Sequence, residues 1–154
     1  MSNFIKLIST FFYSGYVPKV PGTFGTFTAL IFYYFIILFF NPPSLQLALI
    51  TLLIVFISII FSHYSIKIFN SDDPPKVVID EVAGFFVALL FIPFSILNLF
   101  SAFVLFRLFD IWKPYPINYV DDNVKGALGI MLDDILASVY SIITLIVIFF
   151  FLGG

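Results

Sequence analysis

The sequence predicts an all-α, polytopic membrane helix bundle, with about four to five membrane helices and an N-terminal interfacial helix. Composition is the first reason. Of the 154 residues, 62% are hydrophobic, 21% are aromatic and only 10% are charged, unlike a soluble domain. The second reason is that all charged residues fall into three patches, and the uncharged stretches between them are long enough to enter a bilayer. We therefore expect one integral-membrane domain over residues 1–154.

The uncharged stretches give the order of the helices. Val20–Ile66 is broken by the turn signal NPPS at Asn41–Ser44, which predicts two spans. Val82–Phe106 is broken near IPFS at Ile92–Ser95, and each arm would be only about 18 Å long against a hydrocarbon core of about 30 Å. These arms must be re-entrant or extend into the charged flanks. Ile135–Leu152 is the last predicted span.

A hairpin over Val82–Phe106 places all seven Lys and Arg residues on one side of the membrane. The positive-inside rule makes that side cytoplasmic. A single crossing by the same stretch would divide the cations between the two sides, so we favour the hairpin. The N-terminal segment, with apolar residues around the single Lys6, is predicted to lie at the interface before the first span.

Composition also excludes some functions. The chain has no cysteine, so it can form neither a disulfide nor a thiolate nucleophile or metal site. It has no basic tract, which argues against a nucleic-acid partner. The single histidine, His63, is interpreted as a hydrogen-bonded structural residue rather than as a general acid or base.

Most carboxylates come in doublets, at Asp72-Asp73, Asp80-Glu81, Asp121-Asp122 and Asp133-Asp134. The first and third of these doublets fit solvated loop charge as well as they fit a site. The second and fourth are predicted at the starts of apolar helices, where favourable contact with the helix dipole is the simple interpretation. The alternative is a divalent-cation site, because Mg²⁺ prefers carboxylate, water and phosphate oxygens.

The stretch LFRLFDIWKPYPI places three charged side chains at the end of a membrane helix. Arg107 and Asp110 are three residues apart and share a helix face, and Lys113 is predicted to follow on the same side before Pro114. A structural ion pair explains the first two. Cations beside carboxylates and a metal also fit a phosphate clamp.

Two glycine-containing segments open membrane helices. In VPGTFGTF, free backbone N–H groups and the hydroxyls of Thr23 and Thr26 are candidates for binding an anion. In KGALGIMLDD, Gly126 and Gly129 precede Asp133, and glycine lets backbone approach a ligand closely. Two such turns beside carboxylates are stronger evidence than one.

In chain order, PGTFGTFTAL, DDPPKVVIDEVAG, LFRLFDIWKPYPI and KGALGIMLDDILA resemble the motifs of the phosphatidylglycerophosphatase A family. The resemblance implies a Mg²⁺-dependent enzyme of the bacterial inner membrane, facing the cytoplasm, that converts phosphatidylglycerophosphate to phosphatidylglycerol and phosphate. Lys125 stands where some members have histidine, and the resemblance gives it a supporting role in phosphate binding. The acidic and basic motif positions of the family correspond to Asp80, Glu81, Arg107, Asp110, Lys113, Asp133 and Asp134.

Our hypothesis from these residues assigns three roles. Metal binding falls to Asp80, Glu81, Asp133 and Asp134. Catalysis falls to Asp80, Arg107, Asp110 and Asp134. Substrate binding falls to Thr23, Thr26, Arg107, Lys113 and Lys125. The alternatives are another lipid phosphoryl or alcohol phosphotransferase, and a non-enzymatic transporter subunit, which would carry ionisable residues near the middle of its spans.

Overall fold

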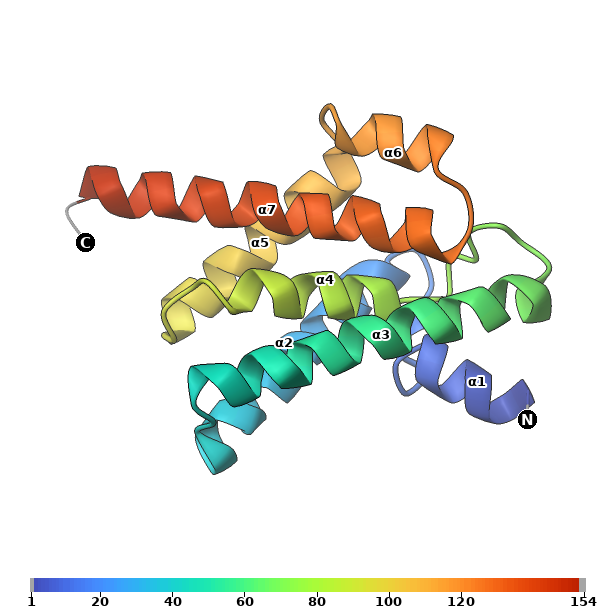
Figure 1. The fold of residues 1–154 in the computed structure, drawn as a ribbon, viewed down its shortest axis with the longest axis horizontal. Coiled ribbons are helices and arrows are strands. Elements are labelled where there is room, and N and C mark those ends of the chain that lie inside the picture. Colours follow the sequence, from blue (N-terminus) through green and yellow to red (C-terminus); the bar gives the residue numbers. More distant parts are fainter. Residues whose placement is uncertain (1, 153–154) are drawn as a thin grey trace.

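The computed structural model describes residues 2–152, in which every regular element is a helix and no strand is present. The prediction of an all-α protein is confirmed. In chain order the elements are α1 (Ser2–Ser9), the 3₁₀-helix η1 (Ser14–Tyr16), α2 (Pro21–Phe40), α3 (Ser44–Phe69), α4 (Ile79–Leu89), α5 (Ile96–Trp112), α6 (Ile117–Asn123) and α7 (Ala127–Leu152). Figure 1 shows them as one elongated bundle.

Three helices are long and apolar enough to cross a membrane, namely Pro21–Phe40, Ser44–Phe69 and Ala127–Phe151. Their outward faces carry large apolar side chains such as Phe39 and Leu45, which are 71% and 73% exposed. Apolar surface on this scale is unfavourable in water and is normal against lipid. The predicted helical membrane bundle is confirmed, and three of its helices are each long and apolar enough to cross the membrane.

Helices α4 and α5 form the predicted hairpin, with the break at residues 90–95. Ser95 caps α5 by accepting a hydrogen bond from the Asn98 backbone N–H at 3.0 Å. Both helices extend into the charged flanks, as one of the two predicted options required. They therefore carry Asp80 and Arg107 on the ends that lie next to the polar connections.

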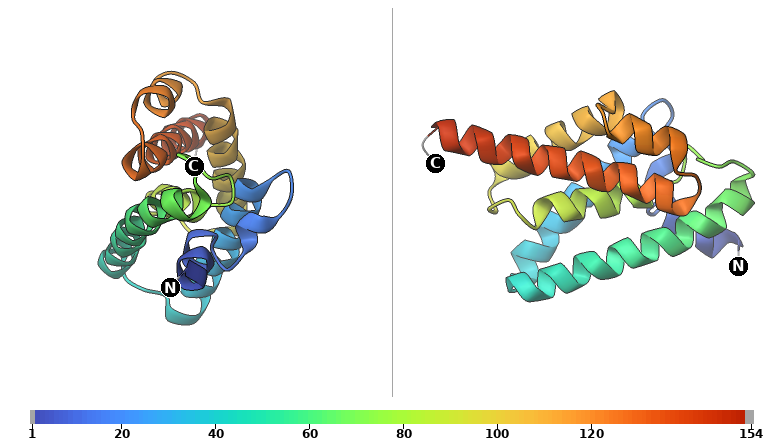
Figure 2. Two further views of the ribbon diagram at one scale, coloured as in Figure 1. Left: turned by 90° about the vertical axis from the view of Figure 1, so that its right-hand side faces the viewer. Right: turned by 45° about the horizontal axis from the view of Figure 1, so that its top comes forward.

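Helix α4 lies at the centre and packs against α2, α3, α5 and α7 (Figure 2). Phe85, Phe86 and Leu89 are fully buried there, which explains why so short a helix is held firmly. Contact with α7 is especially close. Ser138 of α7 donates a hydrogen bond to the backbone oxygen of Gly84, and a Cβ on that glycine would lie 2.8 Å from the Asp134 Cβ.

The two ends of the bundle differ in polarity. The connections at residues 41–43 and 90–95 are uncharged and lie toward the same end of the bundle as the end of α7 (Figure 1). The charged connections, at residues 70–78 and 113–126, lie toward the other end, together with the N-terminus. The charges are thus gathered on one side of the bundle, as the sequence predicted.

The start of α7 differs from the prediction. The helix begins at Ala127 rather than Ile135, because the glycines of KGALGIML sit at its beginning and the following apolar residues continue it without a break. Asp133 and Asp134 therefore lie between one and two turns inside the helix. The interpretation that they stabilise the start of a helix is wrong for this doublet, whereas Asp80 and Glu81 do lie in the first turn of α4.

Candidate active site

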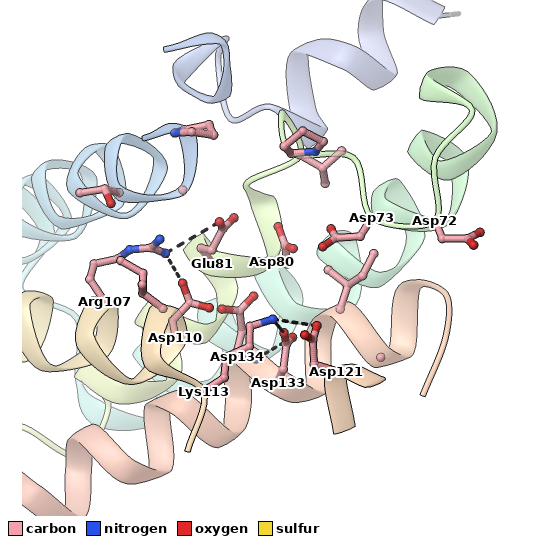
Figure 3. Close-up of a pocket in the computed structure, with 18 of the residues that line it drawn as sticks. Asp72, Asp73, Asp80, Glu81, Arg107, Asp110, Lys113, Asp121, Asp133 and Asp134 are labelled. Atoms are coloured by element: carbon pink, nitrogen blue, oxygen red, sulfur yellow. Dashed lines mark hydrogen bonds and ion pairs between the residues drawn. The ribbon is translucent and has the colours of Figure 1, made fainter. Parts of the chain in front are cut away.

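A pocket of about 620 Å³ opens at the charged end of the bundle. Figure 3 shows its side chains converging from α4, α5, α7 and the polar connections. All nine carboxylates of the chain line it, against four of the seven Lys and Arg residues. The predicted site residues that it brings together are Thr23, Asp80, Glu81, Arg107, Asp110, Lys113, Lys125, Asp133 and Asp134. Of the ten residues we predicted, nine meet here.

Thr26 does not line this pocket. Its side chain is fully buried, and its hydroxyl donates a hydrogen bond to the Gly22 backbone oxygen at 2.8 Å within α2. The prediction that this hydroxyl binds substrate is therefore not supported by its position. Thr23, one turn nearer the start of the helix, does line the pocket.

Arg107 forms one charged group with residues from two helices. Its Nη1 pairs with Asp110 on the same helix, as predicted from the spacing, and lies 3.8 Å from Glu81 Oε1 of α4. Gly22 of α2 packs against Glu81 and Arg107, because a Cβ there would collide with Glu81 Oε1 and come within 3.0 Å of Arg107 Nη2. The Nε atom of Arg107 is buried without a hydrogen-bond partner. The guanidinium thus keeps donor capacity for a ligand.

Lys113 does not join the Arg107 group, contrary to the prediction that it lies on the same side of the helix as Arg107 and Asp110. It is the C-cap residue of α5, with a left-handed φ of 46°, and its Nζ lies 2.7 Å from Asp121 Oδ1 and 2.8 Å from Asp133 Oδ2. Burial lowers the pKa of Lys113, but the hydrogen bonds to both carboxylates outweigh it and raise the pKa above its ordinary value. The ammonium group is a permanent positive charge in the pocket.

Carboxylate oxygens of Asp80, Glu81 and Asp134 are buried without any hydrogen-bond partner. Burial raises the pKa of Asp80 well above its ordinary value, and the neighbouring Glu81 raises it further. Burial likewise raises the pKa of Glu81 to about 7. Buried carboxylates without partners are costly unless a cation compensates them.

The donor set of the pocket fits Mg²⁺, which takes oxygen ligands. Asp80 and Asp134 are the best placed, since both are almost fully buried with a free oxygen, whereas Asp133 already pairs with Lys113. Over residues 2–152, no three His, Cys, Asp or Glu side chains form a ready-made metal cage. A Mg²⁺ ion held by one or two carboxylates, with waters and phosphate oxygens completing its coordination, needs no such cage.

Among the lining residues that sequence reasoning left unassigned, Asp121 and Gly22 contact the predicted site residues directly. The sequence left Asp121 open between solvated loop charge and a site, and the packing of α6 against α7 brings it to Lys113. Gly22 belongs to a segment that drew attention for its hydroxyls, whereas its importance lies in the absent side chain. The glycine itself, directly after a helix-starting proline, was the available signal.

The fold and the pocket are those of a helical membrane protein with a carboxylate-rich site, suited to a metal ion and a phosphate, at the end of its helices. A family model described as Phosphatidylglycerophosphatase A matches residues 7–149, and the chain belongs to this family. No solved structure matches the chain.

Three relatives are similar to the chain over most of its length. The phosphatidylglycerophosphatase A of Escherichia coli is 39% identical over 142 residues, covering 92% of this chain and 81% of that protein. The protein of the same name in Haemophilus influenzae is 33% identical over 153 residues, covering 95% and 89%. A Bacteroides thetaiotaomicron protein, provisionally named a phosphatidylinositol-3-phosphatase, is 38% identical over 150 residues, covering 92% and 91%.

Proposed function

We propose that the protein hydrolyses phosphatidylglycerophosphate to phosphatidylglycerol and phosphate, in a Mg²⁺-dependent reaction at the cytoplasmic face of a bacterial inner membrane. The observation that carries the proposal is the pocket in which unpartnered, buried carboxylates face Arg107 and Lys113 at the ends of membrane helices. The names of two relatives support the substrate. The gathering of the cations at one end supports the cytoplasmic orientation.

Different residues of the pocket would bind the metal, bind the phosphate and position the binding groups. Asp80 and Asp134 would hold the metal, with Glu81 and Asp133 next to them. Bound there, Mg²⁺ supplies positive charge to the phosphate oxygens and lowers the pKa of a bound water. Arg107 and Lys113 donate hydrogen bonds to the phosphate and stabilise the charge that develops on it. Asp110 holds the guanidinium of Arg107 in place through their ion pair.

In the reaction the terminal P–O ester bond breaks, the phosphoryl group is taken by the attacking oxygen, and the lipid alkoxide leaves with a proton as the alcohol. The attacking group is either a water molecule or a carboxylate of Asp80 or Asp134, which would form a phosphoryl-aspartate that water then hydrolyses. Both routes use the same cations to neutralise the phosphate.

A second candidate substrate is a phosphoinositide monophosphate, which the name of the Bacteroides thetaiotaomicron relative favours. Both substrates present a phosphate monoester on a lipid head group, and the pocket would bind this shared group. They differ in the alcohol that leaves, so a direct comparison of the two lipids decides between them.

The test is phosphate release by purified protein in detergent from each lipid, with and without Mg²⁺. We expect release from phosphatidylglycerophosphate that requires Mg²⁺ and is lost in the Asp80→Asn, Asp134→Asn and Arg107→Ala variants. Lys67→Ala is the matched control, because Lys67 lies at the end of α3 outside the pocket. Wild-type turnover in all three site variants would refute the assignment of the site. Alcohol-dependent transfer without free phosphate would favour a phosphotransferase instead.

A further inference from the structure

A second hollow, of about 450 Å³, lies beside the charged pocket between α3 and the start of α7. Its walls are Ile59, Ile60, His63 and Tyr64 of α3 and residues 125–128. We call it the α3–α7 groove. Lys125 and Gly126 line both this groove and the charged pocket, so the two spaces share a boundary.

The boundary is open at Gly126. This residue has a φ of +79°, and a Cβ built on it would meet no atom within 4 Å. At this residue the backbone between the two spaces therefore carries no side chain that would separate them. Lys125, whose Nζ donates to the Asp121 backbone oxygen at 3.3 Å, lies on the same boundary.

The groove changes in polarity along its length. His63, Tyr64 and Lys125 are exposed and polar, and they lie nearest the charged end of the bundle. Ile60 lies seven residues before Lys67 on α3, about 10 Å deeper along the helix, and Leu128 on the opposite wall is 59% exposed. A molecule that fits this order has a polar part at the charged end and a hydrocarbon part further into the membrane.

We propose that the α3–α7 groove holds the first part of one acyl chain of the phospholipid substrate while the phosphate lies in the charged pocket. This rests on the proposed lipid phosphatase activity. Any membrane lipid meets the outside of the groove, but only a lipid with a terminal phosphate monoester can also place that group against the neighbouring cations. Binding of the phosphate makes occupation of the groove effectively intramolecular, which raises the local concentration of that chain over other lipids.

The groove would help by positioning the substrate rather than by releasing free energy through apolar burial. An acyl chain that leaves the bilayer for an apolar groove exchanges one hydrocarbon environment for another, so little free energy is released. A side chain that fills the groove would instead exclude the acyl chain beyond its first carbons, so a long-chain lipid could not bring its phosphate to Lys113. Filling the groove should therefore impair lipid substrates and spare phosphate esters that lack a long chain.

The experiment compares phosphatidylglycerophosphate carrying long acyl chains with the same head group on four-carbon chains. Ile60→Trp fills the groove from α3, and Leu128→Trp fills it from α7. Leu53→Trp is the matched control, since Leu53 lies two turns deeper on α3, is 57% exposed and does not line the groove. For both groove variants we expect KM for the long-chain lipid to rise about tenfold, a loss of about 1.4 kcal/mol, with kcat and the short-chain reaction unchanged.

The outcomes separate the two proposals. If wild-type protein releases phosphate and the groove variants match Leu53→Trp on the long-chain lipid, the groove does not bind the substrate chain. Equal losses on the long-chain and short-chain substrates would also overturn the inference, because the tryptophan would then be disturbing the charged pocket. If wild-type protein releases no phosphate from either substrate, the proposed function fails and the assignment of the groove fails with it.

Discussion

Gly22 of α2 lies directly against the carboxylate of Glu81 in α4, with no room for a side chain between them. The same glycine faces the guanidinium of Arg107, which lies 3.8 Å from that carboxylate. Three helices thus meet at one ion pair, and the missing side chain of Gly22 allows them to do so. The position of Arg107 in the pocket depends on this contact.

The first prediction concerns Gly22→Ala. Alanine favours a helix by about 0.5–1 kcal/mol over glycine, so the variant should fold, but its methyl group must push Glu81 and Arg107 aside. We expect phosphate release to fall on the order of 10- to 100-fold, because small misplacements of catalytic groups are costly. Gly25→Ala, one turn along, is the control, since its Cβ would meet Val78 rather than a charged group. It should lower the melting temperature more than the activity. Equal activity in wild type and Gly22→Ala would contradict the prediction.

The second prediction separates the two lysines assigned to the phosphate. Lys113 bridges Asp121 and Asp133, whereas Lys125 is exposed and contacts only a backbone oxygen. Lys113→Ala should reduce kcat on the order of 100-fold, because an oriented positive charge is lost from the pocket. Lys125→Ala should change it by less than about threefold, as expected for an exposed charge. Steady-state phosphate release measures both, and a larger loss for Lys125→Ala would reverse the assignment.

Local sequence pattern was sufficient for the helices and for most of the site. The uncharged stretches correspond to helices, and the turn at Asn41–Ser44 and the break near Ile92–Ser95 each correspond to a connection in the structure. The spacing of Arg107 and Asp110 predicted their ion pair, because residues three apart on a helix are neighbours. These features depend on residues that are close in the sequence.

The errors came from contacts between distant segments and from helix ends. Lys113 leaves the helical face because it takes a left-handed conformation at the C-cap, and its partners come from α6 and α7. Thr26 satisfies its hydroxyl within α2, which a motif alone does not reveal. The start of α7 was misplaced because Asp133 and Asp134 interrupt its apolar pattern, and the packing of α7 against α4 overrides that interruption. Tertiary packing decides such cases.

The third prediction concerns pH and metal removal. Because burial raises the pKa of Glu81 from 4.5 to about 7, the folded protein binds more protons than the unfolded chain over that interval. In EDTA the melting temperature should therefore fall as pH rises from 4.5 to about 7, and the raised pKa of Asp80 acts in the same direction. Scanning calorimetry in detergent measures the melting temperature at each pH.

Two controls accompany this measurement. Mg²⁺ should flatten the fall in melting temperature, because a bound cation stabilises the ionised carboxylates. Glu81→Gln in EDTA should also reduce the slope, since the variant cannot ionise at this position. Identical slopes with EDTA and with Mg²⁺ would argue against a cation at the buried carboxylates. An unchanged slope in Glu81→Gln would argue against the raised pKa of Glu81.

The fourth prediction concerns the contact between α4 and α7 that brings Asp80 beside Asp134. In Gly84→Ala the new Cβ would lie 2.8 Å from the Asp134 Cβ and 3.1 Å from its backbone oxygen. Backbone cannot yield as a flexible side chain does, so the helices must move apart. We expect a loss of about 1–3 kcal/mol in the free energy of unfolding, together with reduced Mg²⁺-dependent phosphate release. Chemical denaturation in mixed micelles measures the first effect.

Ser138→Ala tests the same contact from the α7 side. The Ser138 hydroxyl hydrogen-bonds to Gly84 in α4 and to the Asp134 backbone oxygen, so its removal should cost about 1 kcal/mol. Thr28→Ala is the matched control, because the Thr28 hydroxyl makes only the bond within its own helix, to the Phe24 oxygen at 2.8 Å. If the contact between the helices holds the two aspartates together, Ser138→Ala should weaken Mg²⁺ activation and Thr28→Ala should not. Equal Mg²⁺ dependence in the two variants would show that the aspartates are held by other contacts.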